Sequence, residues 1–121
     1  MECKSLRIGN YVKHSNIAEP ICITGITPDG KVTFKMPFDN NLDCTSDIDN
    51  ISGIILNYDI INKCVFSKNV SSILMFKNNG DIIIRGYEAD YNGLYLGRVN
   101  ELHRLQNIVH ALYEEELEVN L

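Results

Sequence analysis

The chain has 121 residues, 45% of them hydrophobic and 22% charged, which suits one globular domain with a real core and excludes a disordered chain. Its net charge of -5 works against general binding to nucleic acid or to an anionic membrane. The start, MECKSLRIGN, is polar where a signal peptide is apolar, and no apolar run could span a bilayer. We therefore expect a cytoplasmic protein that binds neither nucleic acid nor membrane.

The four cysteines, at positions 3, 22, 44 and 64, include no C-x-x-C pair. This spacing does not fit a zinc ribbon or a thioredoxin-like redox site. Their even number would allow disulfides, but a reducing compartment agrees better with the missing signal peptide. We expect four free thiols, mostly buried, and neither a bound metal nor another cofactor.

The first 36 residues contain three β-branched stretches that predict strands. These are LRIGNYV (6–12), ICITGIT (21–27) and the run that follows the turn residues Asp29 and Gly30. Together they indicate a curled, three-stranded sheet like part of an SH3-like barrel.

Residues 36–50 are rich in Asp and Asn and predict a polar linker loop. The stretch begins like a calcium loop at Asp39, but Cys44 and Asn50 stand where such a loop needs glycine and glutamate. The sequence therefore favours a solvated loop without a metal.

The next segment predicts a short helix and a hairpin. Asn57 is placed to cap a helix over 58–64. A hairpin is expected over 71–88, with its turn at Asn79 and Gly80. Both hairpin strands are apolar at consecutive positions, which indicates a sheet that is covered on both faces or forms an interface.

A strand is expected over 94–99, and Asn100 is then placed to cap a helix that reaches Tyr113. The final ELEVNL is a candidate edge strand. We predict an α+β fold in one domain, 1–121, with a β-rich subregion (1–36) and an α+β subregion (51–121) whose C-terminal helix packs on the sheet. The apolar stripe of this helix is formed by Leu102, Leu105, Ile108, Val109 and Leu112.

Within that helix, His103 and His110 are two turns apart, about 10 Å along the axis, which is too far to share a metal. His110 and Glu114 have ligand spacing, but a third ligand is missing. We interpret both histidines as solvated or as lying at the edge of an interface. The glutamates 114–116 stand at the end of the helix that disfavours acids, so the helix should end near Tyr113 with these acids exposed.

The segment RGYEADYNGLYLGR interleaves tyrosines and arginines. Such groups stack on bases or anchor a protein partner. The alternative is edge tyrosines that pack their rings and keep their hydroxyls in water. No G-x-S-x-G elbow, P-loop or G-x-G-x-x-G motif is present, so no catalytic residue is assigned. The candidate binding residues are Arg85, Tyr87, Tyr91, Tyr95 and Arg98.

Two blocks together resemble a known pattern. ISGIILNYDIINKCVF is similar to I-x-P-I-P-L-T-x-x-x-L-x-K-x-G-F, and HRLQNIVHALYEEEL is similar to H-x-L-Q-N-L-Y-F-A-L-T-G-E-E-L. With LRIGNYV near the start, the chain resembles a small uncharacterised family encoded by phages and mobile elements of Bacteroidales gut bacteria. The departures include Gly53 and Ile55 in place of prolines, Val65 in place of glycine, and Glu114 in place of the glycine that ends the helix.

The resemblance implies a genomic setting rather than a mechanism, and it points to Gln106 and Asn107 as structural groups that bond to the backbone of neighbouring strands. We expect a non-enzymatic accessory protein, in the host cytoplasm or in the virion, that binds a protein partner or forms a homo-oligomer. A virion component and a host-defence inhibitor both fit. The alternative is a sponge that sequesters a small nucleotide signal of host defence, with Arg85 and Arg98 on its phosphates.

Overall fold

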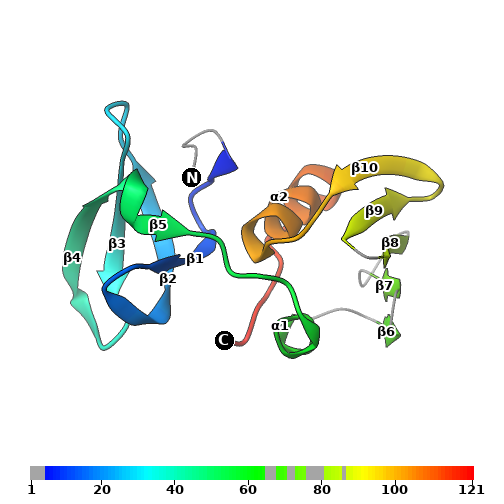
Figure 1. Cartoon of the computed structure of the whole chain (residues 1–121), viewed down its shortest axis with the longest axis horizontal. Helices are drawn as coiled ribbons and strands as arrows, with labels where there is room; N and C mark the ends of the chain where they lie inside the picture. The colour runs from blue at the N-terminus through cyan, green and yellow to red at the C-terminus, as the bar shows by residue number, and fades with distance from the viewer. Residues whose placement is uncertain (1–4, 65–67, 71–72, 76–80, 86) are drawn as a thin grey trace.

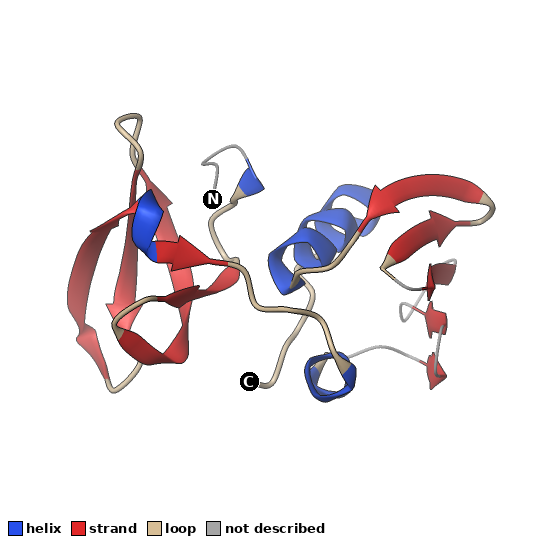
Figure 2. Cartoon of the chain, in the orientation of Figure 1, coloured by secondary structure: helices blue, strands red, loops and turns tan. Residues whose placement is uncertain are grey.

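The computed structural model describes residues 5–64, 68–70, 73–75, 81–85 and 87–121. The fold is α+β, with two antiparallel sheets at opposite ends and the longer helix between them (Figures 1 and 2). None of the helices in these ranges is long and apolar enough to cross a membrane.

The first sheet has the strand order β4-β3-β2-β1-β5. The core of this sheet lies on one of its faces. The β2–β3 hairpin turns at Gly30, whose positive φ of 85° suits the predicted Asp29-Gly30 turn. A short 3-10 helix, Ile48–Asn50, precedes the last strand. The strands are β1 (Tyr11–His14), β2 (Ile17–Ile26), β3 (Lys31–Met36), β4 (Asp39–Asp47) and β5 (Ile51–Ser52).

The first strand begins later than the pattern of residues 6–12 predicts. Ile8 and Gly9 form a turn, and Gly9 has a φ of 98°, which a side chain would disfavour. The backbone N–H of Gly9 still donates to the carbonyl of Ile23 at 2.8 Å, so the turn is tied to β2.

The polar linker loop predicted over 36–50 is wrong, because most of it forms β4. This strand pairs with β3 from Lys31↔Asp47 to Met36↔Asp39 and lies at the edge of the sheet. An edge strand with one solvated face needs few apolar residues, so its composition resembles that of a loop. The strands of the first sheet therefore continue to Ser52.

The short helix predicted after Asn57 is confirmed as α1 (Tyr58–Lys63). The Asn57 side chain accepts a hydrogen bond from the N–H of Ile60 at 2.9 Å, as an N-cap residue does. Cys64, just after the helix, is buried.

The second sheet has the order β10-β9-β8-β7-β6. The predicted 71–88 hairpin is present as β7 paired with β8, while its expected turn at Asn79 and Gly80 lies outside the described residues. The predicted 94–99 strand is β10, one residue shorter. The strands are β6 (Lys68–Val70), β7 (Ile73–Met75), β8 (Asp81–Arg85), β9 (Glu88–Tyr91) and β10 (Leu94–Arg98).

The main helix, α2 (Leu102–Tyr113), ends where the sequence predicts, but its predicted cap is wrong. Glu101 takes the N-cap position without a side-chain cap bond, while the carbonyl of Asn100 accepts from the N–H of Leu56 at 3.0 Å. Among the described residues, the tail after α2 forms one bridge, Cys64↔Val119, rather than the suggested edge strand.

In the part of the chain that the structure describes, the buried residues form two separate clusters. One fills the first sheet: Leu6, Val12, Ile21, Ile23, Val32, Phe34 and Ile51. The other gathers α2, the second sheet and the tail: Ile54, Leu56, Cys64, Ile82, Ala89, Val99, Leu102, Leu105, Val109, Leu117 and Val119.

Candidate protein-binding surface

A buried glutamine on α2 joins the two halves of the molecule. Gln106 is 1% exposed; it accepts a hydrogen bond from the backbone N–H of Tyr11 at 2.9 Å and donates one to the carbonyl of Gly9 at 3.2 Å. The helix thereby satisfies backbone groups that have no partner in the sheet. The expectation that Gln106 bonds to neighbouring backbone is confirmed.

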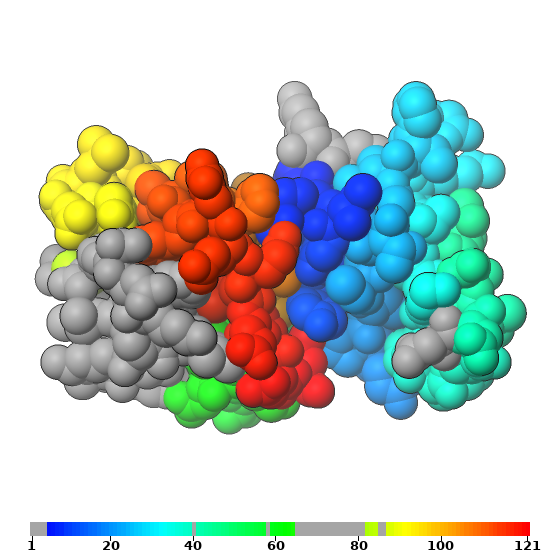
Figure 3. Space-filling view, turned by 180° about the vertical axis from the view of Figure 1, so that it is seen from behind, coloured from blue at the N-terminus to red at the C-terminus, as the bar shows by residue number. Residues whose placement is uncertain are grey.

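Asn107 continues this contact. Its amide donates to the carbonyl of Ser5 at 3.0 Å and accepts from the buried amide of Asn10 at 2.8 Å. Arg7 also donates to Asn107 at 3.3 Å and forms an ion pair with Glu116 in the tail. We call Asn10, Gln106 and Asn107 the amide seam. From behind, the orange and red surface of α2 and the tail lies against the blue surface of the first residues (Figure 3).

The tail runs from the seam toward α1. Its side chains alternate, with Leu117 and Val119 buried and Glu118 and Asn120 exposed. The N–H of Asn120 donates to the carbonyl of Lys63 at 2.8 Å, which holds the tail against α1. The tail is therefore fixed on one side by α1 and faces the first sheet on the other.

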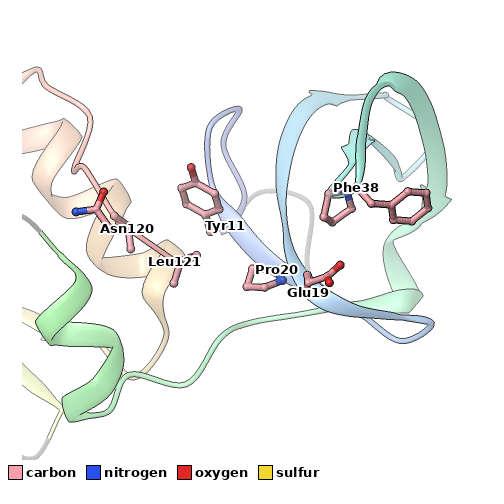
Figure 4. Close-up of a pocket in the computed structure, with 8 residues that line it drawn as sticks. Tyr11, Glu19, Pro20, Phe38, Asn120 and Leu121 are labelled. Carbon is pink, nitrogen blue, oxygen red and sulfur yellow. The ribbon is translucent and has the colours of Figure 1, made fainter.

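Between the tail and the first sheet lie two neighbouring hollows that share the lining residues Tyr11 and Val119, and we call them together the tail groove. The larger hollow, about 620 Å³, is lined by Tyr11, Glu19, Pro20, Pro37, Phe38, Val119, Asn120 and Leu121 (Figure 4). The smaller, about 390 Å³, is lined by Ile8, Gly9, Tyr11, Gln106, Glu116, Leu117, Glu118 and Val119.

The tail groove is apolar and negatively charged. Its outer wall carries Phe38, which is 75% exposed although it is large and aromatic. Its charged lining residues are all carboxylates, and of these Glu116 is paired with Arg7. The hydrogen bond from Arg7 lowers the pKa of Glu116. Glu19 and Glu118 are exposed and have no ion pair among the described residues.

Sequence reasoning missed this groove because its walls come from five separate segments, within residues 8–11, 19–20, 37–38, at Gln106 and in the tail, 116–121. None of these segments forms a motif. The available signal was Phe38, a large aromatic residue in a polar stretch between Pro37 and Asp39, where no apolar periodicity explains it.

The predicted tyrosine and arginine residues do not converge on one pocket in the described part of the chain. The hydroxyl of Tyr87 donates to the carbonyl of Leu56 at 3.2 Å, and Arg98 stacks over the Tyr87 ring at 5.8 Å. Tyr91 packs edge-on against Tyr113, with ring centroids 6.0 Å apart. Two of the three tyrosines therefore support the second core.

The other two predicted binding residues are Tyr95 and Arg85. Tyr95 is 62% exposed and its hydroxyl donates to Glu88. The backbone of Arg85 pairs with that of Glu88, and its side chain lies outside the described residues. Arg98 instead lines a hollow of about 250 Å³ together with Arg104, a residue that is not among the predicted binding residues.

The interpretation of both histidines as solvated is wrong for one of them. His110 is exposed, but His103 is fully buried. His103 precedes Gln106 by three residues, so the two side chains lie on the same side of α2 and are buried together. Burial lowers the pKa of His103, and neither ring nitrogen has a hydrogen-bond partner among the described residues. The glutamates 114–116 are exposed, as predicted.

Cys22, Cys44 and Cys64 are free, and Cys3 lies outside the described residues. Burial raises the pKa of Cys64 to about 12, so its thiol stays protonated at neutral pH. In the described ranges, no group of three His, Cys, Asp or Glu side chains is placed to hold a metal ion.

No protein-family model, curated protein or solved structure matches the chain.

Proposed function

We propose that this chain is a non-enzymatic accessory protein of a phage or mobile element that acts by binding a protein partner, or a second copy of itself, at the tail groove. It would work in the bacterial host cytoplasm or within the virion. Both a virion component and a host-defence inhibitor fit this proposal.

The observation that carries the proposal is the exposure of Phe38 beside a groove. A side chain of this size gains free energy by burial, so 75% exposure at a concave site favours a partner that covers it. Aromatic side chains at the centre of an interface commonly contribute most of its binding energy. The buried thiol of Cys64 stays protonated at neutral pH and therefore offers no thiolate nucleophile, which supports a non-enzymatic role.

A second candidate, the nucleotide sponge, is favoured by one observation. Arg98 and Arg104 line the same 250 Å³ hollow, where two guanidinium groups could hold a phosphate. Arg104 is already bonded to Glu101 at 3.1 Å, however, and Tyr87 and Tyr91 are engaged in packing. Arg98 and Arg104 are thus the residues to test for this function.

We also propose that the first sheet is an SH3-like barrel and that α2 packs on the second sheet. Support for the barrel comes from β5, which pairs with β1 after the 3-10 helix and so brings the first and last strands side by side. Support for the packing comes from the cluster that Leu105 and Val109 share with Ile82 and Ala89.

The test is quantitative affinity capture from phage-infected host cells with matched baits. Phe38→Ser should reduce recovery of the specific partner at least tenfold relative to wild type. Tyr95→Ala is the control, because Tyr95 is similarly exposed but lies on the far hairpin, and this bait should recover the partner normally. Light scattering of the same variants shows whether the partner is a second copy.

The opposite pattern, with the partner retained by Phe38→Ser and lost by Tyr95→Ala, would move the binding surface to the tyrosine-rich hairpin. Thermal stabilisation by a cyclic dinucleotide or an ADP-ribose derivative, abolished by Arg98→Ala, would establish the sponge instead.

A further inference from the structure

The tail presents an open backbone edge to the groove. In its antiparallel bridge with Cys64, the N–H of Asn120 donates to the carbonyl of Lys63, so the N–H of Asn120 and the C=O of Glu118 face the end of α1. The N–H and C=O of Val119 itself point to the opposite edge, the side of the groove that it lines. Among the described residues, these two groups have no backbone hydrogen-bond partner.

An unpaired extended edge is a template for another strand. The hollows on either side of Val119, about 620 Å³ and 390 Å³, leave space for a chain that runs along the tail. The wall opposite the tail presents Tyr11 and Pro20, with the carboxylate of Glu19 next to Pro20 (Figure 4). A segment in this position would place alternate side chains toward this wall and toward solvent.

The negative charge of the tail groove favours some partner segments over others. Glu19 and Glu118, from opposite walls, are exposed and free of ion pairs in the described part of the chain. Within the ranges that the structure describes, no lysine or arginine lines either hollow to offset them. A cationic segment is therefore attracted, and an acidic one is repelled.

We propose that the tail groove binds an extended, lysine- or arginine-bearing segment of a protein partner, which pairs its backbone with Val119 and places cationic side chains near Glu19 and Glu118. This inference rests on the proposed protein-binding function and specifies the chemistry of the partner.

The test uses three end-blocked nonapeptides in which valine alternates with a variable residue. One carries lysine, one carries glutamate, and one is the lysine peptide with alternate backbone amides methylated so that they cannot donate. Each is titrated into the isotopically labelled full chain and followed by amide NMR. The lysine peptide should shift the amides of Tyr11, Phe38 and Val119 and slow hydrogen exchange at Val119.

The glutamate peptide should bind at least tenfold more weakly, and the methylated peptide should lose the protection at Val119. The double variant Glu19→Gln, Glu118→Gln should weaken lysine-peptide binding about fivefold, as two partly exposed ion pairs would, and added salt should have a similar effect. Glu115→Gln, a neighbouring exposed acid that lines neither hollow, is the matched control and should bind as wild type does.

Equal binding of the lysine and glutamate peptides, no response at Val119, or full binding of the methylated peptide would overturn the inference. If Phe38→Ser still abolishes partner capture in that case, the protein-binding function stands and only this description of the partner fails.

Discussion

The two hydrophobic cores and the amide seam between them hold the molecule together in different ways. Each core is a set of apolar side chains that gain from leaving water, largely without regard to direction. The seam depends on hydrogen bonds with fixed geometry, such as those of Gln106 with Tyr11 and Gly9. The cores thus supply most of the stability, while the seam determines how the two halves are oriented and therefore the shape of the tail groove.

The largest expected effect is in the second core. Leu105 is fully buried, so Leu105→Ala should lower the free energy of unfolding by roughly 2–5 kcal/mol, through lost burial and the cavity that remains. Urea denaturation measures this, with Leu94→Ala, at a 66% exposed position, as the control expected to change little. A loss below about 1 kcal/mol would contradict the placement of this stripe in the core.

Disruption of the amide seam should lower the free energy of unfolding less than Leu105→Ala does, but it should affect both halves of the molecule. Gln106→Leu leaves the partly buried N–H of Tyr11 and carbonyl of Gly9 without these partners, at about 2–3 kcal/mol in total. Hydrogen exchange should accelerate at the Tyr11 amide more than within β2 and β3. His110→Gln, an exposed change on the same helix, should leave both quantities unchanged. Equal acceleration throughout the first sheet would show that the seam and that core unfold as one unit.

The buried His103 makes the region around the seam sensitive to acid. Because burial lowers its folded-state pKa, the unfolded chain binds a proton more readily than the folded chain. Stability should therefore fall as the pH drops below the unfolded-state pKa near 6.5, by up to about 1.4 kcal/mol at pH 5.5. Unfolding measured at pH 7.5 and 5.5 tests this. His103→Leu should remove most of the difference, whereas His110→Gln should retain it.

The smallest expected effect is at the end of α2, where the chain leaves for the tail. Glu114 has a φ of 56°, a left-handed conformation that glycine adopts without cost. Glu114→Gly should raise stability by about 0.5–1 kcal/mol, since part of the relieved strain is offset by the greater freedom of the unfolded chain. Thermal unfolding with Glu115→Gly as the control would show whether the gain is specific to this position.

The sequence predicted the features that local patterns determine, and it did not predict those that depend on tertiary contacts. The α2 stripe and the Asn57 cap were predictable because spacing and local hydrogen bonding determine them. β4 was not, because an edge strand has little apolar periodicity. The burial of His103 was missed because a polar residue was taken as solvated, although it shares a helix side with Gln106, which was predicted to be bonded.

The candidate site was less predictable than the fold. Interleaved tyrosines and arginines suggested a binding surface, but two of those tyrosines pack into the core. The groove is assembled from Tyr11, Glu19, Phe38 and the tail, which are brought together only by tertiary structure. No local sequence pattern indicates that these distant residues come together.

The sequence separation across the seam has a consequence for the order of folding. The hydrogen bonds from Gln106 and Asn107 join residues 95 to 102 positions apart, whereas each strand of the first sheet from β1 to β4 pairs with the next along the chain. Closing a loop of that length costs more chain entropy than closing a hairpin, so the meander can form early and the seam closes late. The tail groove would then exist only in molecules that have completed this last step, and a partner that recognises it would distinguish finished chains from partly folded ones.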